Sequence, residues 1–127
     1  MQPDNALNWF EIPVNDFDRA KKFYETIFNY QMHDGMVGVK RMGFFVYDFR
    51  NGKIGGAIVY EPEVYSPRNN GALIYFNCQP DLQQVLNRVD TAGGKIITGK
   101  TIISEQIGYH AIVLDTEGNR IALHSMS

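Results

Sequence analysis

Residues 9–20, WFEIPVNDFDRA, change from one hydrophobic period to another within a few positions. In residues 9–14 every second side chain is large and apolar, which is the period-two pattern of a strand with one buried face. Asn15 or Asp16 can then cap a helix that extends through Tyr30. The apolar residues that recur at helical spacing in this helix are Phe17, Ala20, Tyr24, Ile27 and Phe28. The stretch predicts a strand followed by an amphipathic helix laid over a sheet.

Three more strands are predicted in the first half of the chain, at residues 36–42, 43–49 and 54–60. Residues 50–53, Arg-Asn-Gly-Lys, contain the Asn-Gly pair of a tight hairpin between the last two strands. From Glu61 to Gly71 the composition shifts to Pro, Ser, Asn and Gly, which predicts a connector that runs over the surface.

The same order of elements returns after the connector. A strand is predicted at residues 73–78, a helix at 81–92 with Gly93-Gly94 as its stop, and strands at 95–98, 108–114 and 120–124. The chain is therefore predicted to be one domain, residues 1–127, that contains a strand-helix-three-strand unit twice. The first module covers residues 7–60, the connector 61–71 and the second module 72–127.

Composition narrows the possible functions. With 44% hydrophobic and 20% charged residues, the 127-residue chain has the balance of one packed domain. A net charge of −2 gives no electrostatic basis for binding nucleic acid or an anionic membrane surface. No apolar run approaches the roughly 20 residues that span a bilayer, and residues 1–8 carry no signal-peptide pattern. We expect a cytoplasmic protein, and the single cysteine, Cys78, agrees with a reducing compartment.

Three motifs carry a resemblance to a known family. They are VNDFDRA at residues 14–20 leading to Phe23-Tyr24, VDTAGGK at residues 89–95 and LDTEGNRI at residues 114–121. In this order and spacing the chain resembles the vicinal oxygen chelate superfamily, the glyoxalase and bleomycin-resistance proteins. It is most similar to the lactoylglutathione-lyase-related branch, whose termini resemble residues 8–14 and 118–125.

The resemblance implies an α+β fold in which two βαβββ modules form an open, eight-stranded, cup-shaped barrel, the glyoxalase/bleomycin resistance/dihydroxybiphenyl dioxygenase fold. It also implies a small-molecule ligand inside the cup, helices outside it, and a homodimer. Strand alternation then gives the side chains that face the cup, opposite the helices. They are Trp9, Glu11, Leu73, Tyr75, Asn77, Ala122 and His124.

Metal-using members of the family carry donor side chains on the first, fourth, fifth and eighth strands. In this chain the first, fifth and eighth positions fall on Trp9, Leu73 and Ala122, and the fourth on Gly56 or Ile58. None of these side chains can bind a divalent cation. We therefore expect neither a metal at the family site nor another cofactor.

A relocated metal site would need the three histidines, His33, His110 and His124. They show no ligand spacing, so exposed or hydrogen-bonded histidines are the alternative.

Glu11 and His124 are the candidate catalytic residues. A carboxylate beside an indole could act as a general base, or it could be a rim acid paired with a cation. His124 lies on the same face as Ala122 and could exchange a proton with Glu11, or it could be an ordinary surface histidine near the C-terminus.

Trp9, Leu73, Tyr75, Asn77 and Ala122 are the candidate ligand-binding residues. Tyr75 and Asn77 could orient a ligand, or they could satisfy neighbouring strands. Trp9 could stack on a flat ligand, or it could fill the space of a lost metal. Cys78 falls on the helix-facing side, which favours an inert buried thiol.

Two classes of function remain open from the sequence. The first is a metal-independent protein that holds a small organic molecule in a cup, as bleomycin-resistance proteins do. The second is a lyase or isomerase related to glyoxalase that uses Glu11 and His124 for proton transfer. The absence of donors at the metal positions favours binding.

Overall fold

The computed structural model describes residues 2–127 and contains two modules of the same kind. The elements of the first module are β1 (Trp9–Pro13), α1 (Phe17–Phe28), β2 (His33–Val37), β3 (Lys40–Phe44), the single 3₁₀ turn η1 (Phe49–Asn51) and β4 (Gly55–Tyr60). Those of the second are β5 (Ile74–Asn77), α2 (Leu82–Leu86), β6 (Lys95–Ser104), β7 (Gly108–Leu114) and β8 (Arg120–Ser125). No helix in the described part of the chain is long and apolar enough to cross a membrane.

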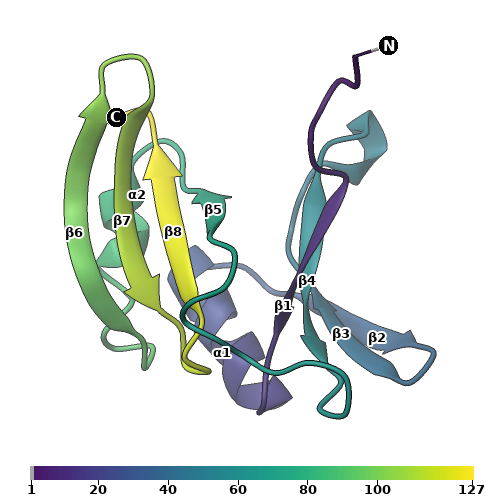
Figure 1. The fold of residues 1–127 in the computed structure, drawn as a ribbon. Coiled ribbons are helices and arrows are strands. Elements are labelled where there is room, and N and C mark those ends of the chain that lie inside the picture. The colour runs from purple at the N-terminus through teal and green to yellow at the C-terminus, as the bar shows by residue number, and fades with distance from the viewer. Residues whose placement is uncertain (1) are drawn as a thin grey trace.

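Each module forms its own four-stranded sheet, and the two sheets have the same topology. The order is β1-β4-β3-β2 in the first sheet, called sheet A, and β5-β8-β7-β6 in the second, called sheet B. In both, the first strand lies parallel to the last and the other pairs are antiparallel. The duplicated α+β architecture predicted from the sequence is confirmed. The sheets stand apart and are not closed into one barrel (Figure 1).

Several boundaries differ from the sequence prediction. The strands predicted at 36–42 and 43–49 are β2 and β3, which lie earlier in the chain because the turn between them falls at Gly38, where φ is +63°. The link from β3 to β4 is long and includes η1, so it is not the tight hairpin that Asn51-Gly52 suggested.

The second module differs from its prediction at two ends. Helix α2 stops at Leu86, since Arg88 and Val89 donate their backbone N–H groups to carbonyls three residues back, in the manner of a 3₁₀ turn. Strand β6 continues to Ser104 instead of ending at residue 98.

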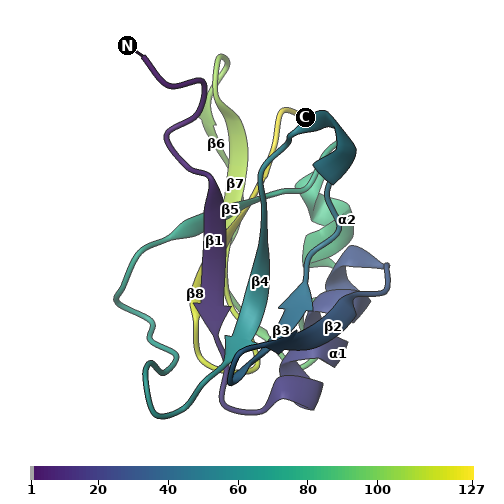
Figure 2. The same ribbon diagram turned by 90° about the vertical axis from the view of Figure 1, so that its right-hand side faces the viewer.

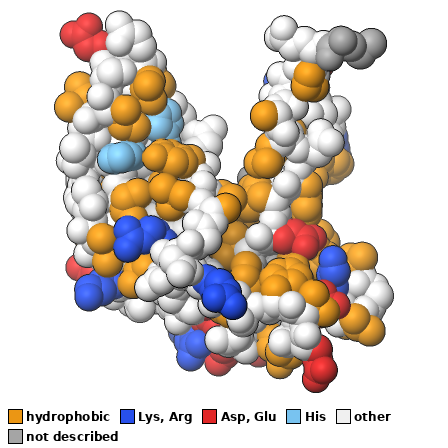
Figure 3. Space-filling model, viewed as in Figure 1, with side chains coloured by type: hydrophobic (Ala, Val, Ile, Leu, Met, Phe, Trp, Pro, Cys, Tyr) orange, Lys and Arg blue, Asp and Glu red, His pale blue; other side chains and the backbone are white. Residues whose placement is uncertain are grey.

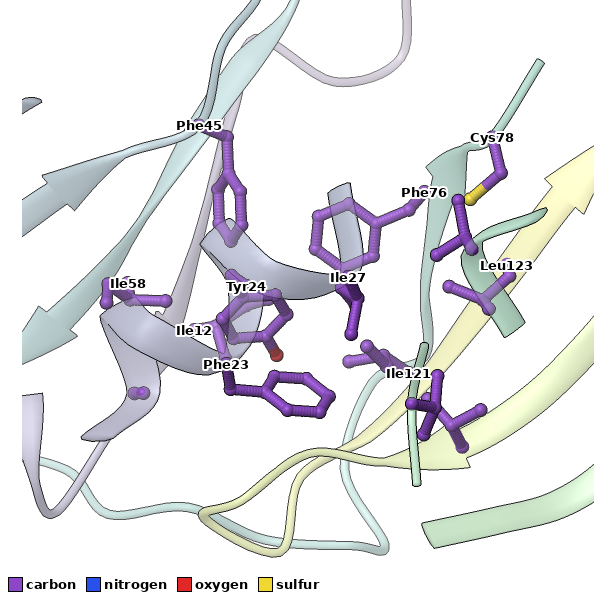
Figure 4. Packing of buried hydrophobic residues seen from close by; sticks show 14 of the residues in the cluster. Ile12, Phe23, Tyr24, Ile27, Phe45, Ile58, Phe76, Cys78, Ile121 and Leu123 are labelled. Carbon is purple, nitrogen blue, oxygen red and sulfur yellow. The ribbon is translucent and has the colours of Figure 1, made fainter. Parts of the chain in front are cut away.

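The helix-facing sides of both sheets share one hydrophobic core with α1. Phe45 of the loop after β3 and Phe76 of β5 lie with ring centroids 5.0 Å apart, and each contacts Tyr24 of α1. Ile27 of the same helix is fully buried between side chains from the two sheets (Figure 4). The helix-facing side of each sheet is buried in this core. We call the opposite side of each sheet its outer face, and it points away from α1.

The turn between β7 and β8 joins the modules. Its buried Asp115 accepts a hydrogen bond from the Tyr24 hydroxyl at 2.6 Å, and Asn119 donates its amide to the Pro13 carbonyl at 2.8 Å. Glu117 accepts hydrogen bonds from the backbone N–H of Asp16 and from the Arg19 guanidinium. These contacts fix the start of α1 against the second module. Both helices lie on the same side of the molecule, away from the connector (Figure 2).

Candidate functional site

The outer face of sheet A carries Trp9 and Glu11. Glu11 lies opposite Ala57 of β4, and the face is built on a small buried cluster of Met42, Ala57 and Val59. Trp9 packs against this cluster with its ring centroid 6.0 Å from that of Tyr47, in an edge-on arrangement. The result is an apolar, aromatic surface that also carries one carboxylate.

Glu11 contacts two side chains from other segments, Tyr65 of the connector and Lys40 of β3. Its Oε1 accepts a hydrogen bond from the hydroxyl of Tyr65, in the connector, at 2.8 Å and lies 3.7 Å from Nζ of Lys40. Burial, followed by the hydrogen bond to Glu11, raises the pKa of Tyr65 well above its ordinary value. The phenol is therefore a donor at neutral pH, and the carboxylate is its acceptor.

The outer face of sheet B carries the other predicted residues. Tyr75 is 50% exposed and its ring lies 6.3 Å from that of His110, whereas Ala122 has no exposed surface. The Asn77 side chain accepts a hydrogen bond from the backbone N–H of Gln79, and the His124 ring nitrogen Nε2 lies 2.5 Å from the Ile107 carbonyl.

His110 has one unusual feature on this face. Its Nδ1 is buried, and it has no hydrogen-bond partner among the described residues. The cross-strand neighbour of His110 is His124. The third histidine, His33, lies on β2 in the other sheet, so the structure does not gather the three.

A cleft of about 930 Å³ separates the two sheets along the edges of β1 and β5. Three of the predicted ligand-binding residues, Leu73, Tyr75 and Asn77, line one wall. Six aromatic side chains also line it: Phe10, Phe28, Tyr30, Phe45, Tyr47 and Phe76. The space-filling view shows this hollow between the arms formed by the sheets, with hydrophobic side chains along it (Figure 3). A cleft of this size and composition suits a small, largely apolar organic molecule.

The aromatic lining of the cleft was missed by sequence reasoning. Phe10 and Phe76 alternate with cup-facing residues, so the pattern assigned them to the core. Phe76 does belong to the core, and Phe10 packs against it. However, β1 and β5 are edge strands, and at an open edge side chains from both faces of the strand can reach the cleft. The only signal in the sequence was the high aromatic content, 13% of the chain.

The structure does not bring Glu11 and His124 together. Glu11 is bonded to the connector over sheet A, and His124 is bonded to the turn before β7 in sheet B. A proton relay between the two has no direct path in this chain.

The four family metal positions do not offer a donor set. Trp9, Leu73 and Ala122 lack donors, and the fourth-strand position needs correction: Gly56 and Ile58 lie opposite Phe10 and Ile12, on the helix-facing side. The outer-face residue of β4 opposite Glu11 is Ala57, which has no donor either. Within residues 2–127 no three His, Cys, Asp or Glu side chains form a group that could hold a metal ion. The family's metal does not fit these residues.

Cys78 follows β5 on the helix-facing side. It is buried, and burial raises the pKa of its thiol to about 11. A thiol that stays protonated at neutral pH and is shielded from solvent is a poor nucleophile.

Comparison with known proteins agrees with this architecture. The model of the Glyoxalase/Bleomycin resistance protein/Dioxygenase superfamily matches residues 6–123. No curated protein is significantly similar to the chain in sequence.

Solved structures of the same fold are similar over the whole chain but distant in sequence. TnmS3, an antibiotic binding protein from Streptomyces sp. CB03234, is 22% identical with a TM-score of 0.66, and the match covers 100% of both chains. A glyoxalase/bleomycin resistance protein from Albidiferax ferrireducens is 18% identical with a TM-score of 0.65, covering 94% of this chain and 98% of that one. A glyoxalase I mutant from Zea mays is 20% identical with a TM-score of 0.67, covering 94% of this chain and 46% of that one.

The duplicated βαβββ topology and a family match that spans residues 6–123 lead to one conclusion. The chain belongs to the glyoxalase/bleomycin resistance protein/dioxygenase superfamily.

Proposed function

We propose that this protein binds a small organic molecule without a metal. The observation that carries the proposal is the aromatic cleft between β1 and β5, which has about 930 Å³ of space and includes Leu73, Tyr75 and Asn77. Flat apolar molecules gain from burial against such walls and from offset or edge-on ring contacts. The few polar side chains at the rim, among them Asp48 and Lys53, would orient the ligand.

The donor chemistry of the chain supports binding over metal-assisted catalysis. Apolar residues occupy the positions at which metal-using members of the family hold their cation, and Glu11 and His124 are each bonded elsewhere. One structural neighbour is described as an antibiotic binding protein, which is a role of the same kind.

We also propose that a homodimer is the binding unit. The outer faces point away from the chain's own core, and Leu73, just before β5, and Tyr75 of β5 remain 38% and 50% exposed. Large apolar side chains that stay exposed on adjoining surfaces are typical of an interface. A second copy would cover these faces and close the open side of each cup.

The cleft can be tested with the fluorescent aromatic probe 1-anilinonaphthalene-8-sulfonate in buffer that contains EDTA. We expect saturable binding with one site per chain, unchanged when Zn²⁺ or Ni²⁺ replaces the EDTA. Tyr75→Ala should weaken binding by up to about tenfold, because an aromatic contact contributes roughly 0.5–1.5 kcal/mol beyond its buried area.

Ile102→Ala is the matched control. Ile102 is 54% exposed on β6, a strand that contributes nothing to the cleft lining, so its loss should leave probe affinity unchanged. Equal affinity of the wild type and Tyr75→Ala, or binding that appears only with metal, would rule the proposal out.

A further inference from the structure

The connector between β4 and β5 folds back over the outer face of sheet A. The backbone N–H groups of Val64 and Tyr65 both donate to the Glu61 carbonyl, which makes a turn directly after β4. Further along, the backbone N–H of Arg68 donates to the Asn119 side chain at 3.2 Å. Between these two anchors most connector residues are exposed, whereas Tyr65 is half-buried against the sheet.

Tyr65 lies in a small site that offers both apolar contacts to its ring and a hydrogen-bond acceptor to its hydroxyl. Its side chain packs on the buried cluster of Met42, Ala57 and Val59, and the side chains of Trp9 and Phe44 pack on the same cluster. Its hydroxyl donates to Glu11 at 2.8 Å, and Lys40 lies close to the same carboxylate oxygen. An apolar floor and a charged acceptor beside it are the parts that recognise one chemical group, an aromatic ring with a hydroxyl.

The site also borders open space. Glu11 lines a separate pocket of about 220 Å³ beneath the connector, together with Ser66, Arg68 and Arg120. A ring that replaced Tyr65 could therefore carry substituents into this pocket. The polar side chains there suit a substituent that forms hydrogen bonds.

We propose that the outer face of sheet A is a binding site for a phenolic ring, and that Tyr65 occupies it as an internal ligand when no phenol is bound. Glu11 accepts the ligand's hydroxyl hydrogen, as it accepts that of Tyr65, and the connector moves aside. The inference rests on the proposed binding function but concerns a different surface from the cleft, and it names the ligand class.

An internal ligand competes at a high effective concentration, so its removal should expose the site. The probe is p-cresol, the side-chain analogue of tyrosine, titrated while the Met42 methyl resonance and the fluorescence of Trp9, the only tryptophan, are followed. We expect Tyr65→Ala to bind p-cresol at least about tenfold more tightly than the wild type does.

The hydroxyl is tested with 4-methylanisole, which has the same ring but no donor. Tyr65→Ala should prefer p-cresol by about tenfold or more, because a hydrogen bond to a charged group is worth roughly 1.5–3 kcal/mol. The double variant Tyr65→Ala/Glu11→Gln should lose most of this preference. Tyr60→Ala removes a tyrosine of β4 that faces away from the site, and it should leave p-cresol affinity at the wild-type value.

Two results would overturn the proposal: equal p-cresol affinity in the wild type and Tyr65→Ala, or equal affinity of Tyr65→Ala for p-cresol and 4-methylanisole. Should Tyr65→Ala fail to fold, Tyr65→Phe keeps the ring and loses only the hydroxyl. It should bind p-cresol several-fold more tightly than the wild type, and unchanged affinity would contradict the proposal. Cleft binding is judged separately by the Tyr75→Ala titration, so either result can fail while the other stands.

Discussion

Glu117 is the residue on which contacts between the modules converge. Its carboxylate accepts from the backbone N–H groups of Asn15 and Asp16 and from the Arg19 guanidinium, and its side chain has no exposed surface. Burial alone would raise the pKa of Glu117, but the hydrogen bonds from Arg19, Asp16, Thr116 and Asn15 outweigh it, so the pKa is lowered from 4.5. The ionised form is therefore the stabilising one.

The pKa of Asp115, in the same turn, is shifted in the opposite direction to that of Glu117. Burial raises its pKa above 3.8 in spite of hydrogen bonds from Tyr24 and Asn119. Its contribution to stability is present at low pH and is lost as the pH rises through the folded value. That of Glu117 is present above pH 4.5 and is lost as the pH falls through its lower folded value. The two effects partly offset each other in the wild type.

The substitution Glu117→Gln should remove the pH-dependent contribution of Glu117 to stability and leave that of Asp115. At pH 7 the substitution should lower the free energy of unfolding by about 1–3 kcal/mol, because donors are left without their charged acceptor. The difference from the wild type should shrink as the pH falls below 4.5, where Glu117 becomes protonated in both the unfolded and finally the folded chain. Urea denaturation between pH 3 and 7 measures it, with exposed Glu105→Gln as control. A difference that is the same at pH 3 and pH 7 would contradict this account.

At the scale of single residues, the sequence predicted which face the residues of β1 occupy but not the partners of Glu11. The alternation of apolar and polar residues in residues 9–14 was enough to place Glu11 on the outer face of sheet A. Its partners Tyr65 and Lys40 come from the connector and from β3, so they depend on how distant segments fold together. The fourth-strand position was assigned to Gly56 or Ile58 because an offset of one residue moves a strand side chain to the other face.

Among the elements, the junction between α2 and β6 is tightly packed against its neighbours. A Cβ added at Gly94 would lie 2.6 Å from the ring of Phe23 in α1 and 2.7 Å from the Leu114 carbonyl oxygen of β7. The motif residues Gly93 and Gly94 thus end the second helical segment and also let the first helix approach the second sheet.

Gly94→Ala should lower the free energy of unfolding by about 1–3 kcal/mol, the usual cost of overpacking, because the Leu114 backbone cannot move away cheaply. Gly99→Ala is the matched control, since a Cβ at Gly99 meets no atom within 4 Å. Chemical denaturation of both variants measures the difference. Equal stabilities would show that the α1 contact at this junction is loose.

Element order was predictable because hydrophobic period and turn residues are local properties. The boundaries that shifted depend on tertiary structure: β6 runs to Ser104 because its whole length pairs with β7, with irregularities at three places. Helix α2 is shorter than its pattern since the chain tightens into 3₁₀ turns after Leu86. Periodicity records which side is buried, and a 3₁₀ turn buries nearly the same side as an α-helix.

For the molecule as a whole, the relation between the sheets was beyond the sequence. Sheet A packs on α1 and sheet B on α2, and the two meet in one core in which Phe45 and Phe76 lie close together (Figure 4). The resemblance implied an open cup, but the strand pattern does not determine how far apart the two sheets stand, because that depends on the packing of side chains from distant segments.

A homodimer should be the state in solution. Sedimentation velocity at micromolar concentration should give a mass of about 29 kDa, twice the chain mass of 14.5 kDa. Exposed apolar side chains of the β2–β3 hairpin, of β5 and the residue before it, and of the β6–β7 turn supply the surface that a partner would bury. They include Met36, Val37, Val39, Leu73, Tyr75 and Ile107. A single species of one chain mass would refute the dimer.

The central claim, metal-free binding of an aromatic molecule, is tested most directly by native mass spectrometry of the protein dialysed against EDTA and mixed with 1-anilinonaphthalene-8-sulfonate. One spectrum reports the number of chains, the ligands held and any metal. We expect one probe molecule per chain and no metal mass, because Trp9, Ala57, Leu73 and Ala122 offer no metal-binding side chain. Probe adducts that appear only after a divalent metal is added, each with that metal's mass, would contradict it.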